Sequence, residues 1–246
     1  MREKRTAIDP VSLEILWARL IAISEEQAAM VLRTAFSNIL RESHDFTCVV
    51  LTPAGDLLAQ PYQTLPGFTR CASVVMKHFL ERWREWHPDD VAITNDPWLA
   101  AGHLHDIAIA VPVFYKGRLV AFSANIAHQA DIGGRGYSAD ANSIFEEGLA
   151  LPPMKLYRGG EVAQEVLDII GENVRVPDQV LGDIQAQIGA ARLGARRITE
   201  LLEEAGLGDL EEVSAAVLAR SEQAMRAAIA RVPDGVYRNE GIMDGF

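Results

Sequence analysis

Histidines and aspartates gather in one segment of the 246-residue chain, between positions 103 and 131. The polar side chains concerned are His103, His105, Asp106, His128 and Asp131. Imidazole and carboxylate groups are ligands that suit zinc, manganese or iron, and a metal site without thiolates is more often catalytic than structural. The segment is therefore a candidate catalytic metal centre. The competing interpretation is a hydrogen-bonded polar network at the ends of two strands.

Two apolar runs with the length and composition of buried strands separate the polar groups, and they extend from Ile107 to Phe114 and from Leu119 to Ala127. The turn signal Tyr115-Lys116-Gly117 between them predicts a β-hairpin. A two-residue Lys-Gly loop would place His128 opposite His105, whereas a three-residue Tyr-Lys-Gly loop would place it on the same face as Asp106. Glycine at the third loop position favours the longer loop, and hence the pairing of Asp106 with His128.

The remaining periodicities predict an α+β fold with a long N-terminal helix, central antiparallel β-hairpins and a helical C-terminal half. Helical spacing extends over Pro10 to Phe36, Cys71 to Trp86, Gly160 to Ile170, Pro177 to Ala205 and Leu210 to Ala230. Further short strands are expected at Cys48 to Leu51, Leu57 to Ala59 and Val91 to Thr94. Gln60 to Arg70 reads as a surface loop and Leu151 to Leu156 as an extended segment. The last residues, from Val232, alternate as a strand does.

Composition narrows the classes of partner. A hydrophobic content of 49% is ordinary for a globular protein, and the net charge of −11 argues against binding to nucleic-acid phosphates or anionic lipid. A small-molecule substrate or a protein partner fits better. Two cysteines, no signal-peptide pattern and no apolar run approaching the ~20 residues of a membrane span predict a cytoplasmic protein.

Three glycines lie between Asp131 and Gly136, so this loop offers backbone that can approach a ligand closely. It is not a phosphate-binding loop of the Gly-Lys-Ser/Thr type, because no such triplet follows. The chain itself therefore shows no ATP site.

Several segments occur together in an order that resembles the hydantoinase B family. They are DPVSLEILWARL, RESHDFT, TNDPWLAAGHLHDIAIAVPVF, AHQADIGGRG and IFEEGLALPPMKL. That family includes the hydantoin-opening subunit, the matching half of 5-oxoprolinase, and the large subunits of acetone and acetophenone carboxylases. The likeness extends from Asp9 to Phe246. Because family members are usually longer, residues 1–246 are expected to be a hydantoinase B-type domain from the N-terminal part of a longer architecture.

The resemblance implies a set of metal ligands. In the carboxylase branch these are a Glu, a His, an Asp and a His, and the matching positions are Glu42, His103, Asp106 and His128. Neighbouring polar residues are then expected to orient the ligands or to move protons, namely His44, Asp45, His105 and Asp131. The ion would be a divalent metal: zinc, manganese or iron.

The resemblance also implies a reaction and a partner. The first hypothesis is a metal-dependent subunit of an ATP-dependent hydantoinase or 5-oxoprolinase that opens a cyclic amide. A hydantoinase A-type ATP-binding subunit would use the ATP, so a hetero-oligomer is expected, with no turnover by this chain alone. The second hypothesis is the large subunit of an ATP-dependent ketone carboxylase, and the third is a non-catalytic scaffold.

Overall fold

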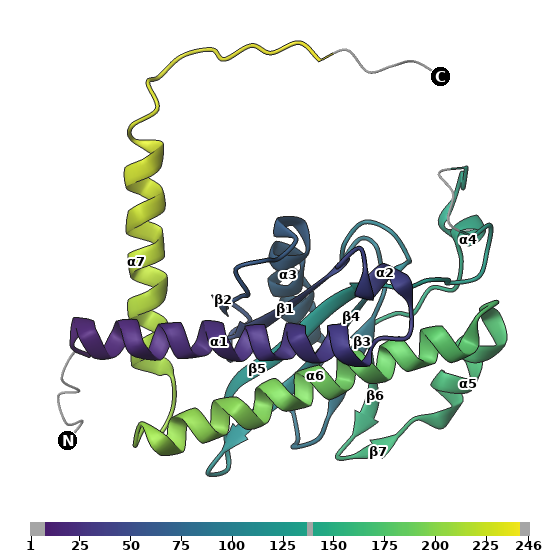
Figure 1. The fold of residues 1–246 in the computed structure, drawn as a ribbon, viewed down its shortest axis with the longest axis horizontal. Coiled ribbons are helices and arrows are strands. Elements are labelled where there is room, and N and C mark those ends of the chain that lie inside the picture. The colour runs from purple at the N-terminus through teal and green to yellow at the C-terminus, as the bar shows by residue number, and fades with distance from the viewer. Residues whose placement is uncertain (1–7, 137–139, 242–246) are drawn as a thin grey trace.

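The protein is built on one seven-stranded antiparallel sheet, seen in a computed structural model that describes residues 8–136 and 140–241 (Figure 1). The strand order is β2-β1-β5-β4-β3-β6-β7. The strands are β1 (Phe46–Leu51), β2 (Leu57–Ala59), β3 (Val91–Thr94), β4 (Asp106–Tyr115), β5 (Arg118–His128), β6 (Met154–Arg158) and β7 (Glu161–Val162). The helices are α1 (Pro10–Thr34), α2 (Asn38–Arg41), α3 (Pro66–Arg82), α4 (Ile144–Glu147), α5 (Gln164–Asn173), α6 (Pro177–Glu204) and α7 (Glu211–Ile229). The predicted α+β class is confirmed.

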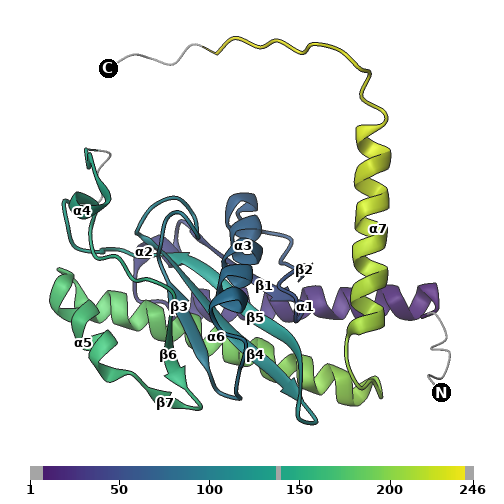
Figure 2. The same ribbon diagram turned by 180° about the vertical axis from the view of Figure 1, so that it is seen from behind.

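Helices cover both faces of the sheet. The long helices α1 and α6 lie side by side across one face, and α3 covers the other, as Figure 2 shows from behind. Strands β4 and β5 occupy the middle of the sheet, so their apolar side chains are buried on both faces. This explains why both strands read as nearly continuous apolar runs. None of the described helices is long and apolar enough to span a bilayer.

The N-terminal helix begins where the sequence predicted. The Asp9 carboxylate accepts hydrogen bonds from the backbone N–H groups of Val11 and Ser12, at 3.1 and 3.0 Å, and Pro10 occupies the first helical position. Both features are N-terminal signals, because the first turn has unsatisfied N–H groups and Pro brings a helical φ. From there α1 buries a stripe of apolar residues against α6 and the sheet.

The central hairpin forms as predicted, but its turn is not the expected one. Tyr115 pairs with Arg118, so the loop has two residues, Lys116 and Gly117, both with positive φ (49° and 78°) as a type I′ turn requires. The expected three-residue loop was wrong. Val113 pairs with Ala121 and Phe114 with Leu119, which leaves one extra residue, Val120, as a bulge in β5.

This bulge decides which polar residues meet. A two-residue turn without a bulge would pair His128 with His105, because side chains alternate with a period of two. The extra residue shifts the register by one position beyond the bulge, and Asp106 pairs with His128. The predicted pair is therefore formed, by a different route from the one expected.

Other expectations differ at the ends of elements. Helix α3 starts at Pro66 and ends at Arg82, so it begins inside the stretch read as a loop. Part of the stretch read as merely extended forms the strand β6, which pairs with β3. The C-terminal residues 231–241 form no strand, although their pattern alternates, because they pair with no strand of the described chain; residues 242–246 lie outside the described part. In Figure 1, α7 and residues 231–241 extend away from the sheet.

Candidate metal centre

Three polar residues lie in one row across three neighbouring strands. Asp106 of β4 pairs with His128 of β5, and the His128 backbone N–H donates to the Asp45 carbonyl, 3.0 Å away, just before β1 begins. Residues paired across antiparallel strands point to the same face. On that face the next residues along β4 and β5, such as Ala108 and Ile126, pack under α3. The row thus lies at the end of a buried, well-ordered sheet.

Asp106 is the centre of the cluster. Its Oδ2 lies 2.6 Å from His103 Nε2, and its Oδ1 lies 3.0 Å from His128 Nδ1. Ligand atoms of the three residues all lie within 4.8 Å of one another. Asp106 and His128 are buried, whereas the His103 side chain is 39% exposed. The arrangement therefore presents three metal-binding groups with access from one side, and the chemistry of this donor set fits a divalent ion.

The hydrogen bonds also set the charges. The hydrogen bond to Asp106 raises the pKa of His103 above its ordinary value. Burial pushes the pKa of Asp106 upward, but hydrogen bonds with His103 and His128 outweigh it and hold that pKa below its usual range. Burial lowers the pKa of His105 and raises the pKa of Asp45. Asp106 is therefore an anion at neutral pH, and His103 holds a proton that an incoming cation must displace.

Glu42, the expected fourth ligand, does not join this cluster. It is exposed at the C-cap of α2, and it belongs to neither group of clustered ligand atoms found among the described residues. The acidic residue of that segment that approaches the cluster is Asp45, whose Oδ2 lies 3.8 Å from His128 Nδ1. The participation of Glu42 stays a prediction.

Asp131 is occupied elsewhere. Its carboxylate accepts hydrogen bonds from the Gly133 N–H, the Arg175 N–H and the Arg175 guanidinium, whose Nη1 lies 2.8 Å from Oδ1. Arg175 also donates to the carbonyls of Gly133 and Gly134. These contacts fix the shape of the glycine-rich loop, and they assign Asp131 a structural task.

The glycine-rich loop packs against protein backbone, where a ligand was expected. A Cβ at Gly134 would lie 2.4 Å from the carbonyl oxygens of Glu146 and Glu147. This close approach brings Glu147, which no spacing in the sequence had marked as a site residue, next to the histidines. Its Oε1 accepts a hydrogen bond from the Leu104 N–H at 3.0 Å and lies 3.9 Å from His105 Nδ1. The sequence signal that contained it was the segment IFEEGL.

The His105 ring stacks on that of His128, with 5.1 Å between centroids and 9° between planes. His105 is buried, as is His128. It therefore lies between the Asp106–His128 pair and Glu147, where a change in its position would affect both.

An open pocket of about 470 Å³ leads to the cluster. His103 and Glu147 line it together with Pro97, Trp98, Gly102 and residues 141–144. Trp98 is 87% exposed, and it places a flat apolar surface beside the two polar groups. The pocket therefore offers both metal-binding groups and a surface for an apolar part of a substrate.

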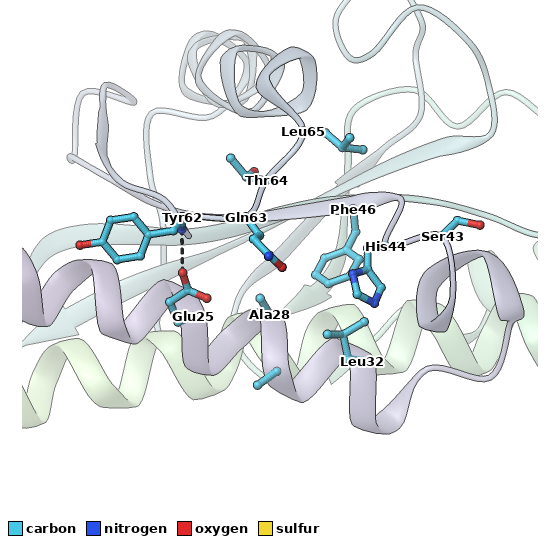
Figure 3. Close-up of a pocket in the computed structure, with 11 residues that line it drawn as sticks. Glu25, Ala28, Leu32, Ser43, His44, Phe46, Tyr62, Gln63, Thr64 and Leu65 are labelled. Atoms are coloured by element: carbon cyan, nitrogen blue, oxygen red, sulfur yellow. Dashed lines mark hydrogen bonds between the residues drawn. The ribbon is translucent and has the colours of Figure 1, made fainter.

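His44 lies in a different pocket, of about 440 Å³, on the α1 side of β1 (Figure 3). Phe46 lines the same pocket and belongs to the apolar cluster of α1, whereas Asp45 precedes it and belongs to the row with His128. Because neighbouring residues of a strand point to opposite faces, the pocket is separate from the histidine cluster. The structure thus does not bring His44 to the candidate centre.

Comparison with known proteins decides the family. The sequence model of the family Hydantoinase B/oxoprolinase matches residues 9–246. The chain belongs to this family. The hydantoinase B-type chain is 35% identical to the B component of a putative D-/L-hydantoinase from Pseudomonas sp. (strain NS671), over 97% of its own length and 42% of the relative.

Two solved structures resemble the hydantoinase B-type chain. The crystal structure of ATP-dependent caprolactamase from Pseudomonas jessenii has a TM-score of 0.88 and 29% identity, covering 97% of this chain and 42% of that one. A nucleotide-free acetone carboxylase has a TM-score of 0.81 at 19% identity, covering 90% and 30%, and it shows the likeness of fold alone. The chain thus spans less than half the length of these proteins.

Proposed function

We propose that this chain is the metal-dependent catalytic part of an ATP-dependent amidohydrolase of the hydantoinase or 5-oxoprolinase type, which opens a cyclic amide. The observation that carries the proposal is Asp106, buried between His103 and His128 at hydrogen-bonding distances. Membership of the Hydantoinase B/oxoprolinase family supports the reaction class. A cytoplasmic location belongs to the same proposal.

His103, Asp106 and His128 would hold the ion, with Glu42 as a further ligand if α2 rearranges. A bound zinc, manganese or iron would polarise the substrate carbonyl and lower the pKa of a bound water. Asp106 fixes both imidazole rings, because each of its oxygens accepts from one of them. Asp45, whose pKa is raised by burial, is placed to hold a proton beside His128. Trp98 lies at the mouth of the pocket, where it would contact the apolar part of the ring.

Metal binding should strengthen as the pH rises. The pKa of His103 lies above its ordinary value of ~6.5, so a proton competes with the ion already at neutral pH. The apparent affinity for Zn²⁺ is therefore expected to fall continuously as the pH is lowered from 8 to 6, by about tenfold per bound proton per pH unit. Calorimetric titration in buffers of different ionisation enthalpy would count the protons released. An affinity that stays constant over this range would contradict the proposed ligands.

A partner is expected to use the ATP. The relative from Pseudomonas sp. is named as one component of a hydantoinase with more than one kind of chain, and the caprolactamase is described as ATP-dependent. We therefore expect the purified chain, supplied with metal, ATP and a hydantoin or 5-oxoproline, to show no turnover. Adding a hydantoinase A-type subunit should restore ATP-dependent ring opening, measured by chromatography of the product. Turnover by the chain alone would refute the division of labour.

A second candidate function is the large subunit of an ATP-dependent ketone carboxylase. The observation that favours it is the shared fold with acetone carboxylase. The complete complex would be incubated with ATP and either a cyclic amide or a ketone with bicarbonate. Ring opening supports the first proposal and carboxylation the second. Metal analysis tests the scaffold hypothesis, because a non-catalytic polar network needs no bound ion.

A further inference from the structure

A second group of ligand atoms lies beside the first one. His103, His105 and Glu147 also offer ligand atoms that are all within 4.8 Å of one another. The rings of His103 and His105 have centroids 5.6 Å apart, and Glu147 Oε1 lies 3.9 Å from His105 Nδ1. Two imidazoles and one carboxylate are again a donor set for a divalent ion of the zinc or manganese type.

The backbone around Glu147 is fixed by contacts that only glycine permits. Gly134 has a φ of +55° and lies against the Glu146 and Glu147 carbonyls, and a Cβ at Gly148 would lie 2.3 Å from the Ile132 carbonyl oxygen. The Leu149 N–H donates to that same oxygen at 2.8 Å. The tightly packed backbone thus delivers the carboxylate to the histidines. A side chain positioned in this way loses less entropy when it binds an ion.

The position is accessible to a cation. Glu147 and His103 both line the open pocket of about 470 Å³, and the Glu147 side chain is 22% exposed. The neighbouring Glu146 is directed elsewhere, because its carboxylate lies 3.2 Å from the Arg135 guanidinium. The two adjacent glutamates therefore differ in task, and Glu146 provides a matched control.

We propose that His103, His105 and Glu147 form a second divalent-cation position, adjacent to the one at Asp106 and His128. The inference rests on the proposed metal centre only through the shared His103. Two divalent ions repel each other, and one histidine belongs to both groups, so the second ion should bind more weakly than the first. Binding is thus expected in two steps.

The test is the stoichiometry of Mn²⁺ binding to the chelator-treated chain, measured by equilibrium dialysis with metal analysis and by electron paramagnetic resonance. The wild type should bind two equivalents, with spin coupling between the ions when both are bound. The E147Q variant should bind one equivalent and lose the coupling, and E146Q should keep both. H105N is a second variant that should also lose the weaker step. Circular dichroism establishes that each variant is folded.

The outcomes separate the two proposals. One equivalent in the wild type, unchanged in E147Q and H105N, would overturn the second position and leave the proposed centre at Asp106 intact. No stoichiometric metal in any of the folded proteins would overturn both. Two equivalents that persist in both E147Q and H105N would place the second ion elsewhere and overturn this assignment.

Discussion

The substitution Asp106→Asn is expected to abolish stoichiometric metal binding while the protein remains folded. Asn has nearly the same shape as Asp, so the buried site is not left with a cavity. It removes, however, the negative charge that faces His103 and His128 at 2.6 and 3.0 Å. Changes to residues that merely orient ligands lower metal affinity about 10- to 100-fold, so loss of a direct ligand should lower it by at least about 100-fold.

The measurement is metal content after dialysis, combined with the thermal unfolding temperature of the metal-free protein. Asp56→Asn is the matched control, because Asp56 is an exposed aspartate whose partner is Lys77, and it should leave the metal content unchanged. His128→Ala should lose the ion as Asp106→Asn does. Full metal content in Asp106→Asn would exclude Asp106 as a ligand and with it the proposed centre.

The second large effect concerns the core behind the site. Gly194→Ala, in the middle of α6, is expected to lower the free energy of unfolding by about 1 to 3 kcal/mol. A Cβ there would lie 2.4 Å from Gln27 Nε2 and 2.5 Å from Ser123 Oγ. Both side chains are buried, and the Ser123 hydroxyl donates to Gln27 Oε1 at 3.0 Å, so neither moves freely. Helix propensity favours Ala by less than about 1 kcal/mol, which does not offset the clash.

Gly189→Ala in the same helix is the control. Its Cβ would meet only the flexible end of Met30, at 3.0 Å, so the helix-propensity gain should cancel most of the cost. Thermal unfolding should show a fall of about 2 to 4 °C per kcal/mol for Gly194→Ala and a much smaller change for Gly189→Ala. Equal melting temperatures would show that α6 can shift away from α1 without cost.

The buried amides beneath the hairpin connect this core to the site. Gln187 of α6 donates to the Ile107 carbonyl and to Asn125 Oδ1, at 2.9 and 3.0 Å, and it accepts from Gln129. It therefore contacts both strands one to three residues away from Asp106 and His128. Nothing in the sequence pattern indicated these polar residues, because a glutamine in an amphipathic helix is ordinarily read as exposed.

Local signals fixed much of the fold before any tertiary contact was known. The Asp9-Pro10 start of α1, the strands flanking Lys116-Gly117 and the length of α6 follow from capping, turn chemistry and hydrophobic periodicity, which depend on neighbours in sequence. The grouping of His103, Asp106 and His128 could also be predicted, because a hairpin brings its two ends together.

Contacts between distant residues decided the rest. The bulge at Val120 sets the register of the hairpin, and it replaces the longer loop that the sequence favoured. Glu147 reaches the histidines because Gly134 and Gly148 permit close backbone packing, whereas Asp131 is taken by Arg175 and Glu42 is exposed at the end of α2. The sequence alone determined which kinds of ligand lie near the hairpin. Only the tertiary structure decided which carboxylates face the histidines, because packing between elements far apart in sequence fixes the direction of each side chain.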